Sequence, residues 1–101
     1  MNTENIVAHA RARFDHESAK RVLKEKYQAK LIFGWNGGMF RTSPELITFL
    51  SLYGDDEIVM LDLYENPIKF KASDVCNIMK AKWQEQMNAW LVEYDELSNK
   101  R

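Results

Sequence analysis

The chain has 101 residues, a length that fits one domain with a modest hydrophobic core, so we expect a single domain over residues 1–101. Because 46% of the residues are hydrophobic, the composition excludes a disordered chain, and no apolar run approaches the roughly 18 residues of a membrane span. A net charge of −1 gives the whole molecule no strong attraction to nucleic acid or membranes, and one cysteine excludes an internal disulfide.

The N-terminal segment, residues 2–28, is predicted to be helical. Ile6, Ala10 and Phe14 recur every four residues, as on one face of a helix. Asp15 would suit the cap of a second helix that begins at His16. The segment is therefore either one helix or two.

A β-hairpin is predicted next. Residues 30–35 favour a strand, and Asn36-Gly37-Gly38 tolerates the positive φ angles of a tight turn before a return strand at 39–42. The face that carries Phe33 and Trp35 is expected to belong to the core. If it were exposed, it would offer a stacking surface for bases or an anchor for a protein partner.

A short helix is predicted to begin at Ser43-Pro44-Glu45. Ser43 suits the N-cap, Pro44 the first helical position, and Glu45 the positive end of the helix dipole. Gly54 is placed to end the helix. Because nearly all of its side chains are apolar, we expect this helix to be buried.

The strongest strand pattern covers residues 58–64. Its nearly continuous apolar run predicts a central strand that is covered on both faces. Residues 65–67 are typical of a turn. Residues 68–71 alternate apolar and basic side chains, as a half-buried strand does.

The C-terminal segment 74–98 is predicted to form one long amphipathic helix, with Ser73 as its N-cap. A helix of this length extends about 37 Å, whereas a compact domain of this size has a radius of gyration near 13 Å. The N-terminal helix or a second copy of the chain must therefore cover its apolar stripe. The stripe follows heptad spacing and is our candidate interface: Trp83, Met87, Trp90, Tyr94 and Leu97.

Together these elements predict an α+β fold in the order α-β-β-α-β-β-α. The strands are expected to form a small, mainly antiparallel sheet with packed helices, and the C-terminal helix to be long and amphipathic. The expected core comprises Phe14, Leu23, Leu31, Phe33, Leu46, Phe49, Leu50, Ile58, Met60, Leu61, Leu63, Phe70, Met79, Trp83 and Trp90.

The near-neutral charge is a cancellation of blocks of opposite sign. Residues 1–30 carry a net charge of +3, and residues 55–66 carry −5. Both blocks are also compatible with a mixed, solvated surface. The acidic candidates for contact with a basic partner are Asp55, Asp56 and Glu57. The basic candidates for contact with nucleic acid are Arg11, Arg13, Lys20, Arg21, Lys24, Lys26 and Arg41.

The sequence contains no pattern typical of catalysis. His9 and His16 are seven residues apart, too distant for easy joint coordination of one metal ion. Cys76 lies on the apolar side of its helix, where we expect a buried thiol rather than a nucleophile. The glycines at 34–38 lack the Lys-Ser/Thr ending of a phosphate-binding loop. We therefore expect no enzyme activity, no metal and no cofactor.

Our first functional hypothesis is a non-enzymatic interaction or assembly module that acts through the C-terminal helix. Its partner would be another protein or a second copy of the chain, as a homo-oligomer, and not a membrane. The alternatives are a nucleic-acid-binding accessory protein that uses the basic N-terminal helix, and an inhibitor that presents the acidic segment to a partner protein. In its size and lack of catalytic motifs the chain resembles small accessory proteins of tailed bacteriophages, which implies an intracellular, cytoplasmic protein.

Overall fold

The computed structural model describes residues 3–99, with side chains from residue 7 onwards except residue 9. Its element order is α-β-β-α-β-β-α, which confirms the predicted α+β class and the long C-terminal helix. The elements are α1 (Thr3–Lys30), β1 (Ile32–Trp35), β2 (Gly38–Arg41), α2 (Pro44–Ser51), β3 (Glu57–Leu61), β4 (Pro67–Lys71) and α3 (Ala72–Asn99).

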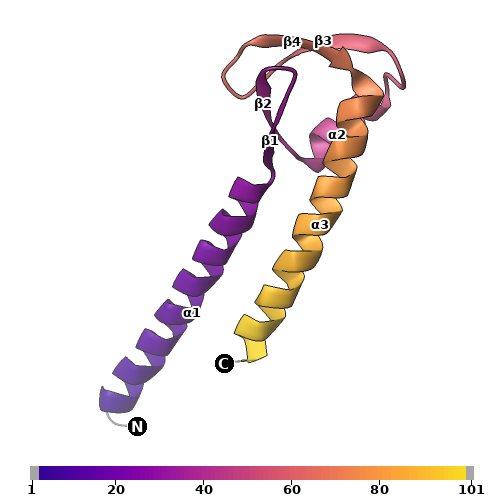
Figure 1. Ribbon diagram of the computed structural model, residues 1–101. Coiled ribbons are helices and arrows are strands. Elements are labelled where there is room, and N and C mark those ends of the chain that lie inside the picture. The colour runs from indigo at the N-terminus through magenta and orange to yellow at the C-terminus, as the bar shows by residue number, and fades with distance from the viewer. Residues whose placement is uncertain (1–2, 100–101) are drawn as a thin grey trace.

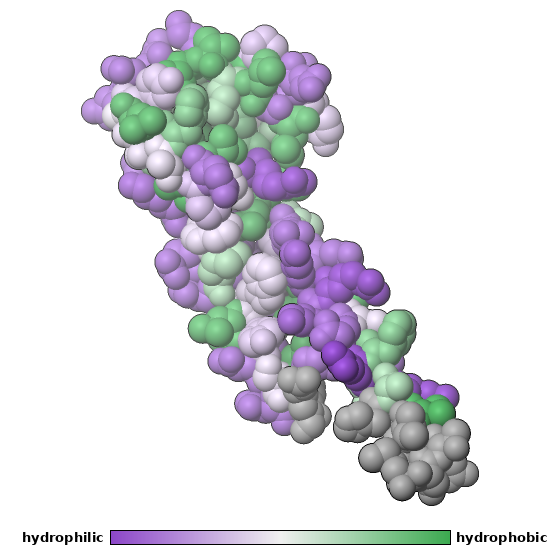
Figure 2. All heavy atoms as spheres, turned by 180° about the vertical axis from the view of Figure 1, so that it is seen from behind, coloured by the Kyte–Doolittle hydropathy of each residue, from purple (hydrophilic) through white to green (hydrophobic). Residues whose placement is uncertain are grey.

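The molecule is elongated, with extents of 66 × 24 × 19 Å and a radius of gyration of 19.4 Å. Helices α1 and α3 run antiparallel and form a stalk, and residues 31–71 form a head at one end of it (Figure 1). Seen from behind, the head exposes hydrophobic side chains over much of its surface, whereas the stalk is mainly hydrophilic (Figure 2).

Helix α1 is continuous, so the one-helix alternative is correct, and Asp15 and His16 lie inside it. Phe14, which we expected in the core, is 68% exposed. The reason is its position in the half of α1 that no other described element covers (Figure 1).

The hairpin formed by β1 and β2 confirms the prediction for residues 30–42. Trp35 pairs with Gly38, and the two loop residues, Asn36 and Gly37, have φ angles of 49° and 83°, as in a type I′ turn. Phe33 and Trp35 are half-buried and pack against the core. The aromatic face of the hairpin is therefore turned inward.

Ser43 caps α2 as predicted, because its Oγ accepts a hydrogen bond from the backbone nitrogen of Leu46 at 3.1 Å. The expectation that α2 is buried all round is wrong. Leu50 is fully buried, but Phe49 and Leu52 are 41% and 78% exposed. Only one side of this helix packs against α3, and the other side lies on the surface of the head.

Strands β3 and β4 pair antiparallel, with Ile58 opposite Phe70. The two hairpins are not joined by strand pairing, so the strands form two separate two-stranded sheets instead of one. The prediction of a central strand over residues 58–64 is wrong. β3 ends at Leu61, and Leu61 and Leu63 are 58% and 40% exposed, because no element within residues 3–99 packs on the outer face of this hairpin.

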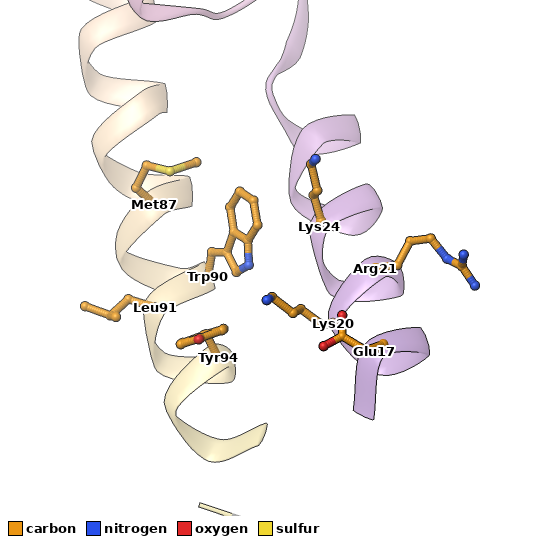
Figure 3. A pocket seen from close by; sticks show the side chains of 8 residues that line it. All are labelled: Glu17, Lys20, Arg21, Lys24, Met87, Trp90, Leu91 and Tyr94. Atoms are coloured by element: carbon orange, nitrogen blue, oxygen red, sulfur yellow. The ribbon is translucent and has the colours of Figure 1, made fainter. Parts of the chain in front are cut away.

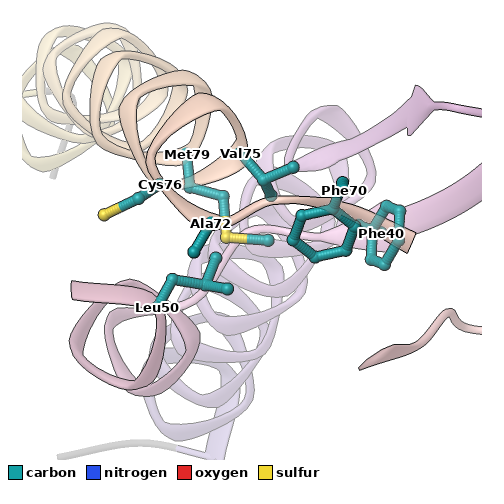
Figure 4. Packing of buried hydrophobic residues seen from close by; sticks show 7 residues of the cluster. All are labelled: Phe40, Leu50, Phe70, Ala72, Val75, Cys76 and Met79. Carbon is teal, nitrogen blue, oxygen red and sulfur yellow. The ribbon is translucent and has the colours of Figure 1, made fainter. Parts of the chain in front are cut away.

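The core lies where the head meets α3 (Figure 4). Helix α3 begins at Ala72 with no loop after β4, so Ser73 lies inside the helix and is not its cap. The backbone nitrogen of Ala72 instead donates to the carbonyl oxygen of Asp56 at 2.9 Å. The buried cluster consists of Phe40, Leu50, Phe70, Ala72, Val75, Cys76 and Met79.

The predicted core is correct in its centre and wrong at its edges. Trp83 and Trp90 are half-buried on α3. Tyr27 and Phe40 are buried, although we did not predict them. The predicted residues that are buried are Leu23, Leu31, Leu50, Phe70 and Met79. Those that pack against the core while partly exposed are Phe33, Leu46, Ile58 and Met60.

The carboxylate of Asp62 joins the two hairpins. It accepts hydrogen bonds from the backbone nitrogens of Met39 at 3.0 Å and of Tyr64 and Asn66 at 2.9 Å. These bonds, above all the one from Met39, hold the pKa of Asp62 below its usual value of 3.8. Asp62 is therefore a structural residue and not part of the free acidic surface.

We expect Asp62→Asn to destabilise the protein and to weaken its dependence on pH in the acid range. Because folding lowers the pKa of Asp62, its stabilisation is present above about pH 4 and is lost as the pH falls through the pKa of the folded state. Denaturant midpoints measured from about pH 7 to about pH 2 should therefore converge for the variant and the natural protein. Asp55→Asn, in an exposed turn, is the control, and an equal response of both variants would contradict this role.

Candidate interaction site on the stalk

The contact between α1 and α3 is centred on two aromatic rings. The ring of Tyr27 stacks on that of Trp90, with centroids 6.0 Å apart and an interplanar angle of 6°. Tyr27 is 2% exposed. Nearby, Lys26 Nζ lies 2.7 Å from Glu93 Oε1. These two contacts set the register of the helices.

Near this contact, Lys26 and Glu93 each stabilise the charged form of the other. The hydrogen bond from Lys26 lowers the pKa of Glu93 and raises that of Lys26. Burial raises the pKa of the Tyr27 hydroxyl, and the adjacent Glu93 carboxylate raises it further. Because the side chains of Lys26 and Glu93 are 45% and 35% exposed, water screens their attraction. The aromatic stack therefore contributes more to holding the helices together.

Beside this contact, a groove with a volume of about 470 Å³ opens between the two helices (Figure 3). The α3 wall is apolar and aromatic, and the α1 wall is charged. Lys20 and Lys24 lie across from Trp90 and Tyr94. The groove is lined by Glu17, Lys20, Arg21, Lys24, Met87, Trp90, Leu91 and Tyr94.

Exposed apolar side chains also lie on α1 beyond the groove. Phe14 and Val7 lie seven and fourteen residues before Arg21, so all three share one face of the helix. Phe14 and Val7 are 68% and 48% exposed. From the register set by Tyr27 and Trp90, residues 3–17 of α1 project about 22 Å beyond the last residue of α3. The projecting helix is thus α1, not the C-terminal helix.

The predicted interface residues lie on the side of α3 that faces α1. Trp83, Met87, Trp90 and Leu97 are half-buried, and Tyr94 is 39% exposed. The N-terminal helix therefore covers the inner side of the heptad stripe. Sequence reasoning missed Leu91, which lines the groove and is 57% exposed. It falls outside the heptad positions, and its only signal is that it is an apolar residue next to the stripe.

The predicted basic residues do not form one continuous stripe. The structure brings Lys20, Arg21 and Lys24 together in the groove, whereas Lys26 is paired with Glu93. The remaining three are exposed and lie elsewhere: Arg11 and Arg13 on the projecting half of α1, and Arg41 in the head on β2.

The predicted acidic residues Asp55, Asp56 and Glu57 are exposed in the head, at the start of β3. Glu57 Oε2 lies 3.3 Å from Lys69 Nζ on β4.

Cys76 is 4% exposed, and its Sγ lies 3.7 Å from the carbonyl oxygen of Ile47. The side chain of His9 lies outside the described residues. Among the side chains that are described, no group of three or more His, Cys, Asp and Glu is arranged to hold a metal ion.

Comparison with known proteins found no matching family model, no matching curated protein and no matching solved structure. Within residues 3–99, no helix is both long enough and apolar enough to cross a membrane.

We expect Trp90→Ala to destabilise the protein by about 2 kcal/mol, because it removes the half-buried ring that stacks on Tyr27. Lys26→Met, which removes the neighbouring ion pair and keeps the aliphatic stem, should have little measurable effect. Urea unfolding of both variants compares the two contacts. A larger loss for Lys26→Met would show that the ion pair, not the stack, holds the helices together.

Proposed function

We propose that this protein is a non-enzymatic assembly module that self-associates through its stalk, with a second copy of the chain in the groove. The observation that carries the proposal is the set of exposed apolar side chains on the stalk, made by the apolar α3 wall of the groove and by Phe14 and Val7 on α1. Met and aromatic side chains, such as Met87 and Trp90 here, concentrate at the centres of protein interfaces.

The projecting half of α1 supports this proposal because it has no neighbour within residues 3–99 of its own chain. In proteins, most of the stability of a helix comes from packing of its apolar face. Phe14 and Val7 provide such a face. Packing of this half of α1 along the stalk of a second copy would bury it.

The charges on the stalk favour a second copy over other partners. Helix α1 carries a net charge of +3, and α3 carries −3. A twofold axis at the groove would place the basic wall of each copy (Lys20, Arg21 and Lys24) beside the acidic end of the partner's α3. Twofold symmetry would form both contacts at once.

We expect a concentration-dependent dimer in sedimentation equilibrium between about 1 μM and about 1 mM. Phe14→Glu combined with Leu91→Glu places charges on both helices of this face, so the dimer should dissociate while the melting temperature of the monomer is kept. Both side chains are more than half exposed, at 68% and 57%, and their replacement leaves the core intact.

Val59→Glu is the matched control, because Val59 is 64% exposed but lies in the head. This variant should dimerise like the natural protein. A natural protein that stays monomeric over the whole concentration range, or a control that dissociates equally, would overturn the proposal.

A second candidate function is the binding of single-stranded nucleic acid in the same groove. It is favoured by the position of Lys20 and Lys24 opposite Trp90 and Tyr94, since cations that contact phosphates and aromatic rings that stack on bases form such sites. The net charge of −1 favours self-association instead.

This second candidate predicts that a labelled oligonucleotide binds in fluorescence anisotropy and dissociates as salt rises. Lys20→Glu combined with Lys24→Glu should abolish the binding. Arg11→Glu combined with Arg13→Glu, outside the groove, should weaken it much less. Absence of binding at about 50 mM salt would eliminate this candidate.

A further inference from the structure

We propose that the free edge of β3 is a docking site for an extended, basic segment of another protein, which adds there as a third strand. The site lies in the head and does not depend on self-association of the stalk. It is formed by Glu57, Val59 and Leu61, whose outward backbone groups make no hydrogen bond to another strand within residues 3–99.

Along the β3–β4 hairpin, residue pairs that are hydrogen-bonded alternate with pairs that are not, and this alternation identifies the backbone groups of β3 that do not bond to β4. Ala72 donates to Asp56 at 2.9 Å, and Asp62 donates to the carbonyl oxygen of Asn66 at 3.0 Å. Because the bonded pairs of an antiparallel ladder alternate, Ile58 and Met60 also bond to β4. The amide and carbonyl groups of Glu57, Val59 and Leu61 therefore point away from β4.

The opposite edge of this hairpin is partly occupied. The side-chain nitrogen of Asn36, in the turn of the other hairpin, donates to the carbonyl oxygen of Lys69 at 3.1 Å. Pro67 has no backbone N–H to offer at that edge. Proteins commonly protect edge strands with charges, proline or a covering loop. Residues 58–61 of β3 contain neither a charge nor a proline, so this edge is open.

The side chains of β3 define what the site would accept. Val59 and Leu61 are 64% and 58% exposed on its outer face. The acidic residues Asp55, Asp56 and Glu57 precede the apolar run, and the hairpin turn that follows it carries Glu65. An incoming strand therefore needs apolar side chains in its middle and basic side chains at its ends.

Strand β4, which pairs with the other edge of β3, already has the apolar and basic side chains that the incoming strand would need. It alternates apolar and basic residues in Ile68-Lys69-Phe70-Lys71, and Lys69 Nζ lies 3.3 Å from Glu57. A second β3 strand fits less well, because antiparallel pairing centred on Val59 would bring the acidic start of each β3 close to the acidic turn of the other. Charge complementarity therefore favours a basic partner.

The test measures amide hydrogen exchange in the full-length protein by NMR, with the capped peptide Lys-Val-Lys-Val-Lys-Val-Lys as the probe. Exchange at Val59 and Leu61 should slow at least about tenfold on addition of the peptide. The amides of Ile58 and Met60, which already bond to β4, should change much less. This alternating pattern distinguishes strand addition from nonspecific charge attraction.

Two control peptides separate the contributions of charge and backbone. The acidic peptide Glu-Val-Glu-Val-Glu-Val-Glu should not bind, and an N-methylated form of the basic peptide should bind at least about tenfold more weakly. On the protein side, Val59→Lys should abolish binding, whereas Val22→Lys, at a similarly exposed position on α1, should not. Thermal unfolding of both variants checks that they fold.

Three outcomes would overturn the proposal. The first is unchanged exchange at about 1 mM peptide. The second is equal binding of the N-methylated or acidic peptide. The third is exchange at Val59 and Leu61 that is already slow without peptide and slows further as the protein concentration rises. The third outcome would assign the edge to a second copy of the chain.

Discussion

The packing of the first turns of α3 into the head is the contact on which the rest of the structure depends. Ala72, Val75, Cys76 and Met79 supply four of the seven residues in the buried cluster. No loop separates β4 from α3, so the direction of the β3–β4 hairpin also sets the direction of the helix. Three turns after Met79, Trp90 reaches Tyr27 on α1. The position of the stalk is therefore fixed by the core of the head.

The sequence predicted well those features that depend on neighbouring residues. Ser43 caps α2 and Asn36-Gly37 forms a tight turn because each residue acts on backbone within a few positions of itself. Features that depend on distant residues were not predicted. Asp62 was counted in the acidic block, since nothing nearby shows that its carboxylate binds the amide of Met39, 23 residues away. Apolar content alone also does not distinguish a strand buried on both faces from an exposed edge strand such as β3.

The candidate site was predicted in pieces and not as a whole. The heptad spacing correctly indicated that the stripe on α3 must be covered, and left open whether the N-terminal helix or a second copy covers it. In the structure α1 covers the inner side, and it brings Lys20 and Lys24 opposite the aromatic residues of α3. The helix register decides this arrangement, and no local pattern encodes it. Two surfaces that the sequence presents separately, one basic and one aromatic, thus become the two walls of one groove.

The contact between Asn36 and Lys69 has a consequence for how copies of this chain associate. Open-ended stacking of hairpins into a fibre requires every hairpin to offer two free edges, one for the copy before it and one for the copy after it. Here the β1–β2 turn and Pro67 block the β4 edge. Head-to-tail stacking of these hairpins therefore has no site at which to continue. The β3–β4 hairpin thus keeps one open edge, at β3, which limits stacking in the manner of an amyloid fibre.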